Sequence, residues 1–440
     1  MSVETSLAFG AAAPAGPLDA EQATAIVRQG RERALALRAL PVERILEDLG
    51  RLRPLWGRGG AYREAYLRAR AADARTSPML ELALDRFAAA LVPGLLRRRL
   101  ASQLANPECL DRFVATQSGR AMRAEPLGTV LHVVSGDVFV EPVELLIGAL
   151  ITKNASVMKC PTGQELFLTL FQKSLDEVAP ALGAATAVLA WPGGATEVEA
   201  AIAAQVDGVL VAAGPHTVAA YRRLASPATA LIELGPRVSL AVVSAAGLAT
   251  LSDGALARDV ALWDQLASTA AQVVYVQGAA AAQAVAERLA AALEALESEL
   301  PSGPGTLNER IEIARLRDGA RFGEVAGTAR LFASTAPALW TVVYEDDRRF
   351  LPSPLRRSVR VKAYDALDDL TATLGPVRGA LQTAGLGVGA DERADYQDAL
   401  ARSGVRRICA LGRMNLPAID ELKDGGMELS RLVRWVEGIA

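Results

Sequence analysis

The chain has few residues that bind metals or form disulfides. Its 440 residues include three Cys and two His. The Cys residues, at positions 109, 160 and 409, do not have the spacing of metal ligands, and two His are too few for a typical zinc site. We therefore expect no metal centre, and we expect the protein to work in a reducing compartment, the cytoplasm.

Long apolar runs and blocks of like charge are also missing. No stretch of about 20 apolar residues lacks charges or turn formers, so the sequence predicts no membrane span, and its first 17 residues lack the regions of a signal peptide. The formal net charge is −3, with acids and bases interspersed, which argues against nucleic-acid binding. Apolar residues make up 51% of the chain, enough for a large core shared by two packed domains.

The first half of the chain changes texture twice. Residues 1–18 are rich in Ala, Gly and Pro, which predicts a disordered arm. Residues 19–106 carry apolar side chains at helical spacing, which predicts an N-terminal helical region. Residues 107–232 alternate short apolar runs with helical segments, a pattern typical of a doubly wound parallel sheet. Strands are expected at residues 128–134, 156–159, 186–190 and 208–212.

The second half repeats the alternation of strands and helices over residues 233–400. We expect strands at 272–276, 340–344, 360–364 and 381–385, and a long helix at 279–300. Residues 401–440 are expected to complete the first domain. The predicted fold class is therefore α/β, with two doubly wound parallel-sheet domains and an N-terminal helical region.

Four turns follow the strands of the first predicted sheet, where ligands bind in such folds. They are Ser135-Gly136-Asp137, Lys159-Cys160-Pro161-Thr162, Trp191-Pro192-Gly193-Gly194 and Ala213-Gly214-Pro215. No G-x-G-x-x-G motif follows the first strand, so the ordinary dinucleotide-binding fingerprint is absent.

Two further residues have the character of a catalytic pair. Glu233 lies in an apolar strand just before a Gly-Pro turn, and Ser268 lies among small residues about one helix later. A carboxylate can serve as general base and a hydroxyl as covalent nucleophile.

The residues around Ser268 carry a family resemblance. Asp264-Gln265 precedes it and Gln272-Val273-Val274 follows it, which resembles the LuxC-like acyl-CoA reductases of the aldehyde dehydrogenase superfamily. The resemblance runs from about Gly128 to the C-terminus, where this family has an "RI" strand, a "HDG" turn and a "LVRW" helix in that order. The fold that it implies is aldehyde-dehydrogenase-like.

The resemblance also implies an activity and site residues. The activity is NADPH- or NADH-dependent reduction of an acyl thioester, acyl-CoA or carrier-bound acyl, to an aldehyde. Lys159 would contact the adenosine ribose, and the turns with Gly193, Gly194 and Gly214 would face the diphosphate. We also expect a homo-oligomer and a partner enzyme that activates the acyl group.

Three departures affect the chemistry. Ser268 stands where the family has Cys, Asp137 where it has Asn, and Lys423 where it has His. A serine hydroxyl needs base activation that a thiolate does not, and a carboxylate repels a developing oxyanion. Two hypotheses follow: a reductase with impaired chemistry, or a non-reducing scaffold that transfers acyl groups through Ser268 or binds an acyl-activating enzyme. In either case we predict Ser268 at the head of a helix or just before one.

Overall fold

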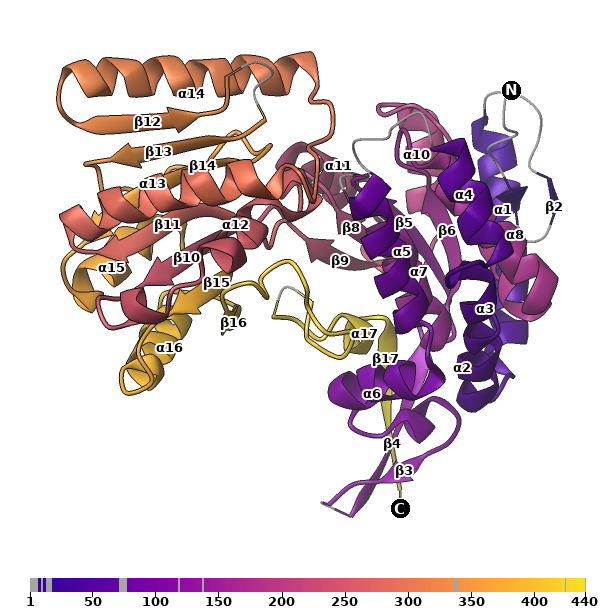
Figure 1. Cartoon of the computed structure of the whole chain (residues 1–440). Helices are drawn as coiled ribbons and strands as arrows, with labels where there is room; N and C mark the ends of the chain where they lie inside the picture. Colours follow the sequence, from indigo (N-terminus) through magenta and orange to yellow (C-terminus); the bar gives the residue numbers. More distant parts are fainter. Residues whose placement is uncertain are drawn as a thin grey trace. The chain divides into compact units, whose positions relative to one another are not determined.

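The computed structural model describes residues 7–8, 11–12, 18–70, 77–117, 119–136, 138–335, 339–423 and 425–439. The chain divides into two compact units (Figure 1). Unit 1 comprises residues 1–71, 81–236 and 418–440, and unit 2 comprises residues 72–80 and 237–417.

Unit 1 contains a seven-stranded sheet in the order β2-β1-β7-β6-β5-β8-β9. The strands are β1 (Leu7–Ala8), β2 (Ala11–Ala12), β5 (Thr129–Val134), β6 (Ala155–Lys159), β7 (Thr186–Leu189), β8 (Gly208–Ala212) and β9 (Ala230–Leu234). Strands β5 to β9 are parallel, and β1 is antiparallel to β7. Every residue of the central strand β5 is buried, as expected for a strand covered on both faces.

Helices connect these strands and cover the sheet. The connecting helices are α7 (Glu141–Ile151), α8 (Glu165–Val178), α9 (Pro180–Gly183), α10 (Thr196–Ala203) and α11 (Pro215–Leu224). The N-terminal helices are α1 (Ala20–Arg38), α2 (Val42–Gly50), α3 (Arg53–Trp56), α4 (Ala61–Ala69), α5 (Ser77–Ala90), α6 (Pro93–Leu104) and the 3-10 turn η2 (Pro107–Leu110). Helix α1 starts at a capping box formed by Asp19 and Gln22 and packs against β5 and β6. The N-terminal helical region therefore contributes to the core of unit 1.

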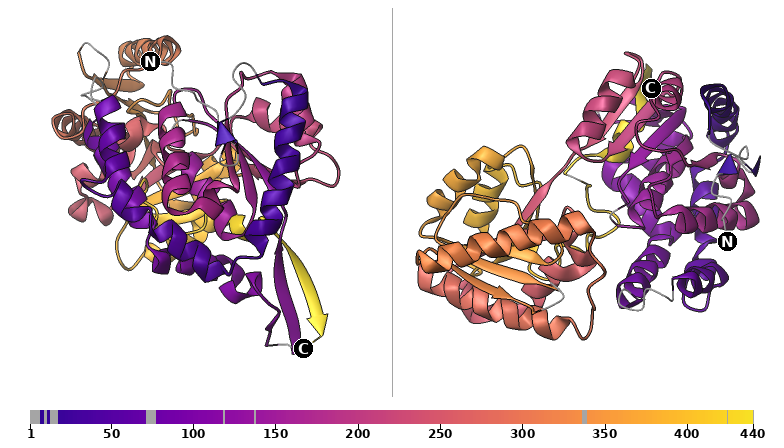
Figure 2. Two further views of the ribbon diagram at one scale, coloured as in Figure 1. Left: turned by 90° about the vertical axis from the view of Figure 1, so that its right-hand side faces the viewer. Right: turned by 90° about the horizontal axis from the view of Figure 1, so that it is seen from above.

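A second, three-stranded antiparallel sheet belongs to unit 1. It is formed by β3 (Val114–Ala115), β4 (Arg120–Pro126) and β17 (Val433–Ile439), and β17 pairs with β4 over seven residues (Figure 2). The helix that the family motif suggested at residues 432–435 is wrong, because the helix α17 (Glu428–Arg431) ends before it. Val433, Trp435 and Val436 are residue types that favour a strand, and β4 offers the segment a complete row of backbone partners.

Unit 2 is built on another seven-stranded sheet, in the order β12-β13-β14-β11-β10-β15-β16. The strands are β10 (Val238–Val243), β11 (Ala271–Gln277), β12 (Ala329–Ala333), β13 (Thr341–Glu345), β14 (Ser358–Tyr364), β15 (Leu381–Gly387) and β16 (Arg407–Ala410). Strand β12 is antiparallel to β13, and the others are parallel. The helices are α12 (Asp253–Ala261), α13 (Ala279–Leu296), α14 (Leu307–Val325), α15 (Leu367–Leu374) and α16 (Arg393–Arg402), with 3-10 turns η3 (Gly247–Thr250), η4 (Leu262–Gln265) and η5 (Gly375–Val377).

Both faces of the unit 2 sheet are covered. Val273 and Tyr275 of β11 join a buried cluster with Leu370 of α15 and Leu400 of α16. Helix α13 also packs against β11, as well as against β13 and β14. The central strand β11 is buried over six of its seven residues, so its position, and that of the turn before it, is tightly fixed.

The predicted α/β class with parallel sheets is confirmed, but several boundaries differ from those expected. Residues 401–417 lie in unit 2, since β16 pairs with β15. Within the expected disordered arm, residues 7–8 and 11–12 form paired strands, and residues 1–6, 9–10 and 13–17 lie outside the described residues. Among the helices that the structure describes, none is both long and apolar enough to cross a membrane.

Candidate functional site

Ser268 lies in an exposed turn between η4 and β11. Its backbone oxygen accepts a hydrogen bond of 2.7 Å from the Ser239 hydroxyl, whereas its own hydroxyl has no hydrogen-bond partner in the described part of the chain. The prediction that Ser268 stands at or before the head of a helix is wrong. The apolar run of β11 begins three residues later and pairs with β10 and β14, which leaves no room for a helix.

The backbone just before this turn has a rare conformation. Trp263, Asp264 and Gln265 have φ values of 59°, 52° and 62°, and a second run, Leu355, Arg356 and Arg357, has 65°, 52° and 58°. Left-handed conformation costs a non-glycine residue roughly 1–2 kcal/mol. Two such runs of three residues persist only where their surroundings hold them in place.

Gln265 joins the two left-handed runs. Its side-chain nitrogen donates to the carbonyl oxygens of Ala271 and Ser358, both at 2.8 Å, and its side-chain oxygen accepts from the Ser358 backbone N–H at 2.9 Å. Gln265 is fully buried. It therefore ties the start of β11 to the start of β14 and fixes the backbone three residues before Ser268.

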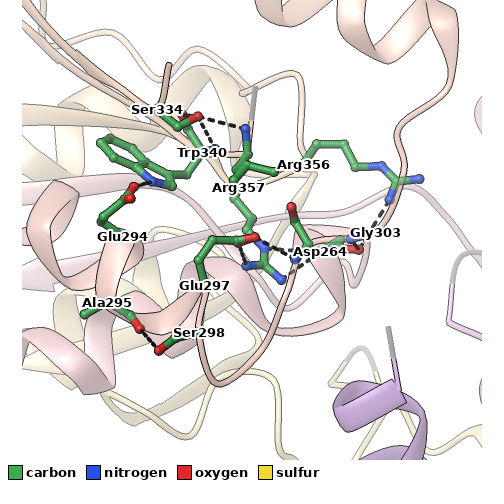
Figure 3. A network of polar contacts seen from close by, with 12 residues as sticks. Asp264, Glu294, Ala295, Glu297, Ser298, Gly303, Ser334, Trp340, Arg356 and Arg357 are labelled. Atoms are coloured by element: carbon green, nitrogen blue, oxygen red, sulfur yellow. Dashed lines mark hydrogen bonds and ion pairs between the residues drawn. The ribbon is translucent and has the colours of Figure 1, made fainter. Parts of the chain in front are cut away.

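An ion-pair network holds the same two runs together (Figure 3). The Arg357 guanidinium, 1% exposed, contacts Asp264 at 2.9 Å and Glu297 at 2.7 Å. Arg356 contacts Glu309 at 2.9 Å, and Asp264 also accepts the Gly303 backbone N–H at 2.9 Å. Sequence reasoning missed this network, because nothing in the local pattern pairs Asp264 with an arginine 93 positions away.

The loop at residues 412–415 forms hydrogen bonds with Thr269 of the Ser268 turn and with Asp259 of α12. The Thr269 hydroxyl donates to the Asn415 side-chain oxygen at 2.8 Å, and the Asn415 side-chain nitrogen donates to the Asp259 carbonyl at 2.8 Å. The Asp259 carboxylate accepts the backbone N–H groups of Gly412 at 2.5 Å and Met414 at 2.9 Å. Burial raises the pKa of Asp259 to about 7, although these two hydrogen bonds act in the opposite direction.

Glu233 was expected to begin the second domain, at residues 233–400, but it lies in β9 of unit 1. Ser268 belongs to unit 2. Both carboxylate oxygens of Glu233 accept from Arg222, at 2.8 and 2.6 Å. The structure describes each residue within its own unit, and their pairing as base and nucleophile stays a prediction.

Lys159 lies at the end of β6 within a polar cluster of unit 1. Its ammonium group contacts the Glu199 carboxylate of α10 at 2.5 Å and lies 5.3 Å from the ring centre of Trp191. Burial and the neighbouring Glu199 charge raise the pKa of Tyr221 far above its usual range. A hydrogen bond from the Tyr221 hydroxyl to Glu199 contributes to this shift, and among the described residues the Trp191 indole N–H is buried without a hydrogen-bond partner.

The predicted glycine turns leave open space. Gly193 and Gly194 follow β7, and Gly214 caps α11. A Cβ atom at any of the three would meet no atom within 4 Å, and Gly194 has a φ of +83° that favours glycine. Open turns after the parallel strands β7 and β8, together with Lys159 and the unpaired indole N–H of Trp191, fit a group that carries ribose and phosphate oxygens, so these residues could hold a nicotinamide dinucleotide.

The other two departures from the family pattern have different outcomes. Asp137 lies outside the described residues. The Lys423 ammonium group contacts the Glu144 carboxylate of α7 at 3.0 Å, so a lysine at this position joins the C-terminal segment to the first crossover helix. Over the described ranges, no group of three or more His, Cys, Asp or Glu residues has the arrangement of a metal site.

Comparison with known proteins identifies the family. The profile of the acyl-CoA reductase (LuxC) family matches residues 37–435. The chain belongs to this family. Because the match begins before Gly128, helices α2 to α6 also belong to the family pattern, which the motifs alone did not indicate.

Relatives of this LuxC-family chain include proteins named long-chain acyl-protein thioester reductase. The protein from Aliivibrio fischeri is 24% identical over 327 residues, which cover 72% of this chain and 64% of that protein. The protein from Photobacterium phosphoreum is 23% identical over 352 residues, which cover 76% of this chain and 67% of that protein. The chain thus spans about two thirds of the length of these relatives.

Solved structures with the same fold are aldehyde dehydrogenases. A proline utilization A mutant from Bradyrhizobium japonicum has a TM-score of 0.72 and 16% identity, over 96% of this chain and 45% of that one. Aldehyde dehydrogenase C from Pseudomonas syringae, a C291A mutant complexed with NAD+ and octanal, has a TM-score of 0.66 and 14% identity, over 96% of this chain and 90% of that one. These similarities confirm the aldehyde-dehydrogenase-like fold.

Proposed function

We propose that the chain binds an acyl thioester and a reduced nicotinamide cofactor, as an acyl-thioester reductase of the LuxC type whose covalent step is impaired at Ser268. The observation that carries the proposal is the exposed Ser268 turn, which follows Asp264-Gln265 in a chain of this family. The names of the relatives support an acyl-thioester substrate. The acyl-activating partner enzyme and the homo-oligomer expected from the sequence belong to the same proposal.

The residues of the chain have defined roles in this proposal. The Ser268 oxygen attacks the acyl carbonyl carbon and forms an oxygen ester, and its proton leaves with the released thiol. A bound NADH or NADPH would supply the hydride that turns the acyl group into an aldehyde. Lys159 and the open turns at Gly193, Gly194 and Gly214 would hold this cofactor.

The first step is slow because Ser268 lacks activation. A serine hydroxyl becomes a good nucleophile only beside a general base, and none lies within hydrogen-bond distance of Ser268 among the described residues of unit 2. Both oxygens of the candidate base, Glu233, are occupied by Arg222. A thiol at position 268 would need far less activation, since a substantial fraction of a thiol ionises near neutral pH once its pKa is lowered.

The test compares the natural chain with Ser268→Cys. Each protein is incubated with a long-chain acyl-CoA, and the intact mass is measured with and without NADH or NADPH. We expect an acyl adduct on the Cys variant that disappears when the cofactor is added, with release of aldehyde, and little adduct on the natural chain. Rapid aldehyde production by the natural chain would contradict the impaired covalent step.

A second candidate function is a non-reducing acyl-binding scaffold, and the Arg222–Glu233 ion pair favours it. If Arg222 keeps Glu233 engaged in every state, the chain lacks a base even when the nucleophile is restored. The same experiment separates the two candidates, because Ser268→Cys would then bind acyl-CoA but form no adduct. Acyl transfer through Ser268 would instead leave an adduct that an acceptor thiol removes without any cofactor.

A further inference from the structure

We propose that Glu199 makes the cofactor subsite selective for NADH over NADPH. The inference rests on the proposed function, which places the adenosine ribose of a nicotinamide cofactor at Lys159. The two cofactors differ only in the 2′ substituent of that ribose, a hydroxyl in NADH and a phosphate in NADPH, so the charge beside Lys159 decides between them.

The charge of Lys159 is already neutralised within the protein. Its ammonium group contacts Glu199 at 2.5 Å, and the side chains are 15% and 8% exposed, respectively. The Trp191 ring lies beside the ammonium group. An ion pair this well shielded from water is screened far less than a surface pair, so each partner strongly affects any third charge that approaches.

A 2′-phosphate has two ways to bind here, and both are unfavourable. It can approach the intact pair, which brings its negative charge beside the Glu199 carboxylate. Alternatively, it can draw Lys159 away, which leaves the Glu199 carboxylate buried without its counterion. Repulsion between like charges and an unpaired buried charge are both costly in such an environment.

A 2′-hydroxyl meets neither obstacle. It is neutral, and it can donate to the Glu199 carboxylate while it accepts from the Lys159 ammonium group, so the ion pair stays intact. The buried Trp191 indole N–H, which has no partner among the described residues, provides a further hydrogen bond for an oxygen of a ligand. An acidic residue that accepts from a ribose hydroxyl is the usual NAD-selecting device in doubly wound folds.

The test measures dissociation constants of NADH and NADPH for the full chain and for two variants, by nicotinamide fluorescence. We expect the natural chain to bind NADH about tenfold more tightly or better, because a like charge this close and this shielded has at least that effect. Glu199→Gln should reduce the preference about tenfold, chiefly by tightening NADPH binding. Glu197→Gln is the matched control, since it removes the same charge from an exposed position of the same helix, and it should leave the preference unchanged.

The outcomes separate this inference from the proposed function. Equal or tighter binding of NADPH by the natural chain overturns the selectivity, and this comparison needs no variant. An unchanged preference in a folded Glu199→Gln protein assigns the selectivity to another residue and overturns the role of Glu199. If neither cofactor binds, the proposed function fails, and the inference falls with it.

Discussion

At position 268, one oxygen atom stands where the family resemblance predicts sulfur. Three cysteines elsewhere in the chain do not compensate for it. Burial raises the pKa of Cys109 to about 11 and that of Cys160 to about 12, so both remain thiols at neutral pH. The small residues around Ser268 leave its side chain exposed, and a thiol there would be the accessible one.

We expect Ser268→Cys to create a reactive thiol. Iodoacetamide should label residue 268 at least about tenfold faster than Cys109 or Cys160, because alkylation needs an exposed thiolate. Peptide mass spectrometry after a time course measures the three rates in one sample, with the partly exposed Cys409 as an internal reference. A rate at position 268 no greater than that of the buried cysteines would contradict the exposed turn.

Asp259 should make the stability of unit 2 depend on pH. Its pKa is about 7 in the folded chain and about 3.9 in an unfolded one. The folded state therefore binds the proton more tightly, so the stabilisation is fully present below about pH 4 and is lost as the pH rises to about 7. The total loss is up to roughly 4 kcal/mol, since each pKa unit corresponds to ~1.4 kcal/mol.

Urea unfolding of the natural chain and of Asp259→Asn, at intervals between pH 5 and 8, measures this dependence. The free energy of unfolding of the natural chain, relative to that of the variant, should fall as the pH rises and become constant above about pH 7. A difference that does not change with pH would show that Asp259 keeps the same charge across this range.

At the scale of the elements, the sequence predicts the alternation of strands and helices because parallel strands that are buried on both faces are continuous apolar runs. The expected strands at 156–159, 208–212 and 272–276 each match an observed strand to within a residue or two. Strand β17 was misassigned because its partner β4 is more than 300 residues away, and a short segment takes its conformation from such a partner. The order of strands and helices was therefore more predictable than the pairing of strands that lie far apart in the sequence, such as β4 and β17.

The site was less predictable than the fold for a related reason. Its side chains come from segments far apart in sequence, such as Thr269 with Asn415 and Asp264 with Arg357. Positive φ at Gln265 has no signal in the sequence, because glutamine normally avoids that conformation. Lys159 was singled out by its place after β6, but its partner Glu199 was not, since a glutamate on a helix is ordinarily exposed.

The Gln265 contacts allow a test of how the turn before Ser268 is held. Gln265→Glu keeps the size of the side chain but replaces an N–H donor by an oxygen that faces two carbonyl oxygens. We expect the free energy of unfolding to fall by roughly 3 kcal/mol or more, because two hydrogen bonds are lost and a charge is buried. Denaturant unfolding measures the change.

Gln277→Glu is the matched control for this substitution. It makes the same chemical change at the other end of β11, where the side chain is partly exposed and donates to one carbonyl, that of Asp365, at 3.0 Å. Its effect should be smaller, since water can solvate the new carboxylate. Equal effects of the two substitutions would contradict a special role of Gln265.

At the scale of the whole molecule, the division of the chain makes unit 1 depend on residues 418–439 and unit 2 independent of them. These residues supply β17, the full-length partner of β4, and Glu428, which forms an ion pair with Arg99 in which both side chains are 2% exposed. Truncation after Pro417 should therefore speed hydrogen exchange in β4 and β5 and leave β10 and β11 protected.

A point variant checks the truncation without removing a strand. Glu428→Ala leaves Arg99 buried without its counterion, which costs roughly 3–5 kcal/mol in comparable cases. Its exchange pattern should change in the same segments of unit 1. Loss of protection in β10 or β11 in either protein would contradict the independence of unit 2.

The same division sets an order of events while the chain is being made. When residue 417 leaves the ribosome, every strand of the unit 2 sheet has been synthesised, whereas the edge of β4 that pairs with β17 has been without its partner for about 300 residues. At ~5–20 residues per second, residues 418–439 follow within roughly 1–4 s. During that interval the nascent chain carries an open strand edge, the kind of surface that chaperones bind and that aggregation exploits. A chain that ends near residue 417 would therefore have a complete unit 2 and a unit 1 with an exposed strand edge, which quality control can recognise.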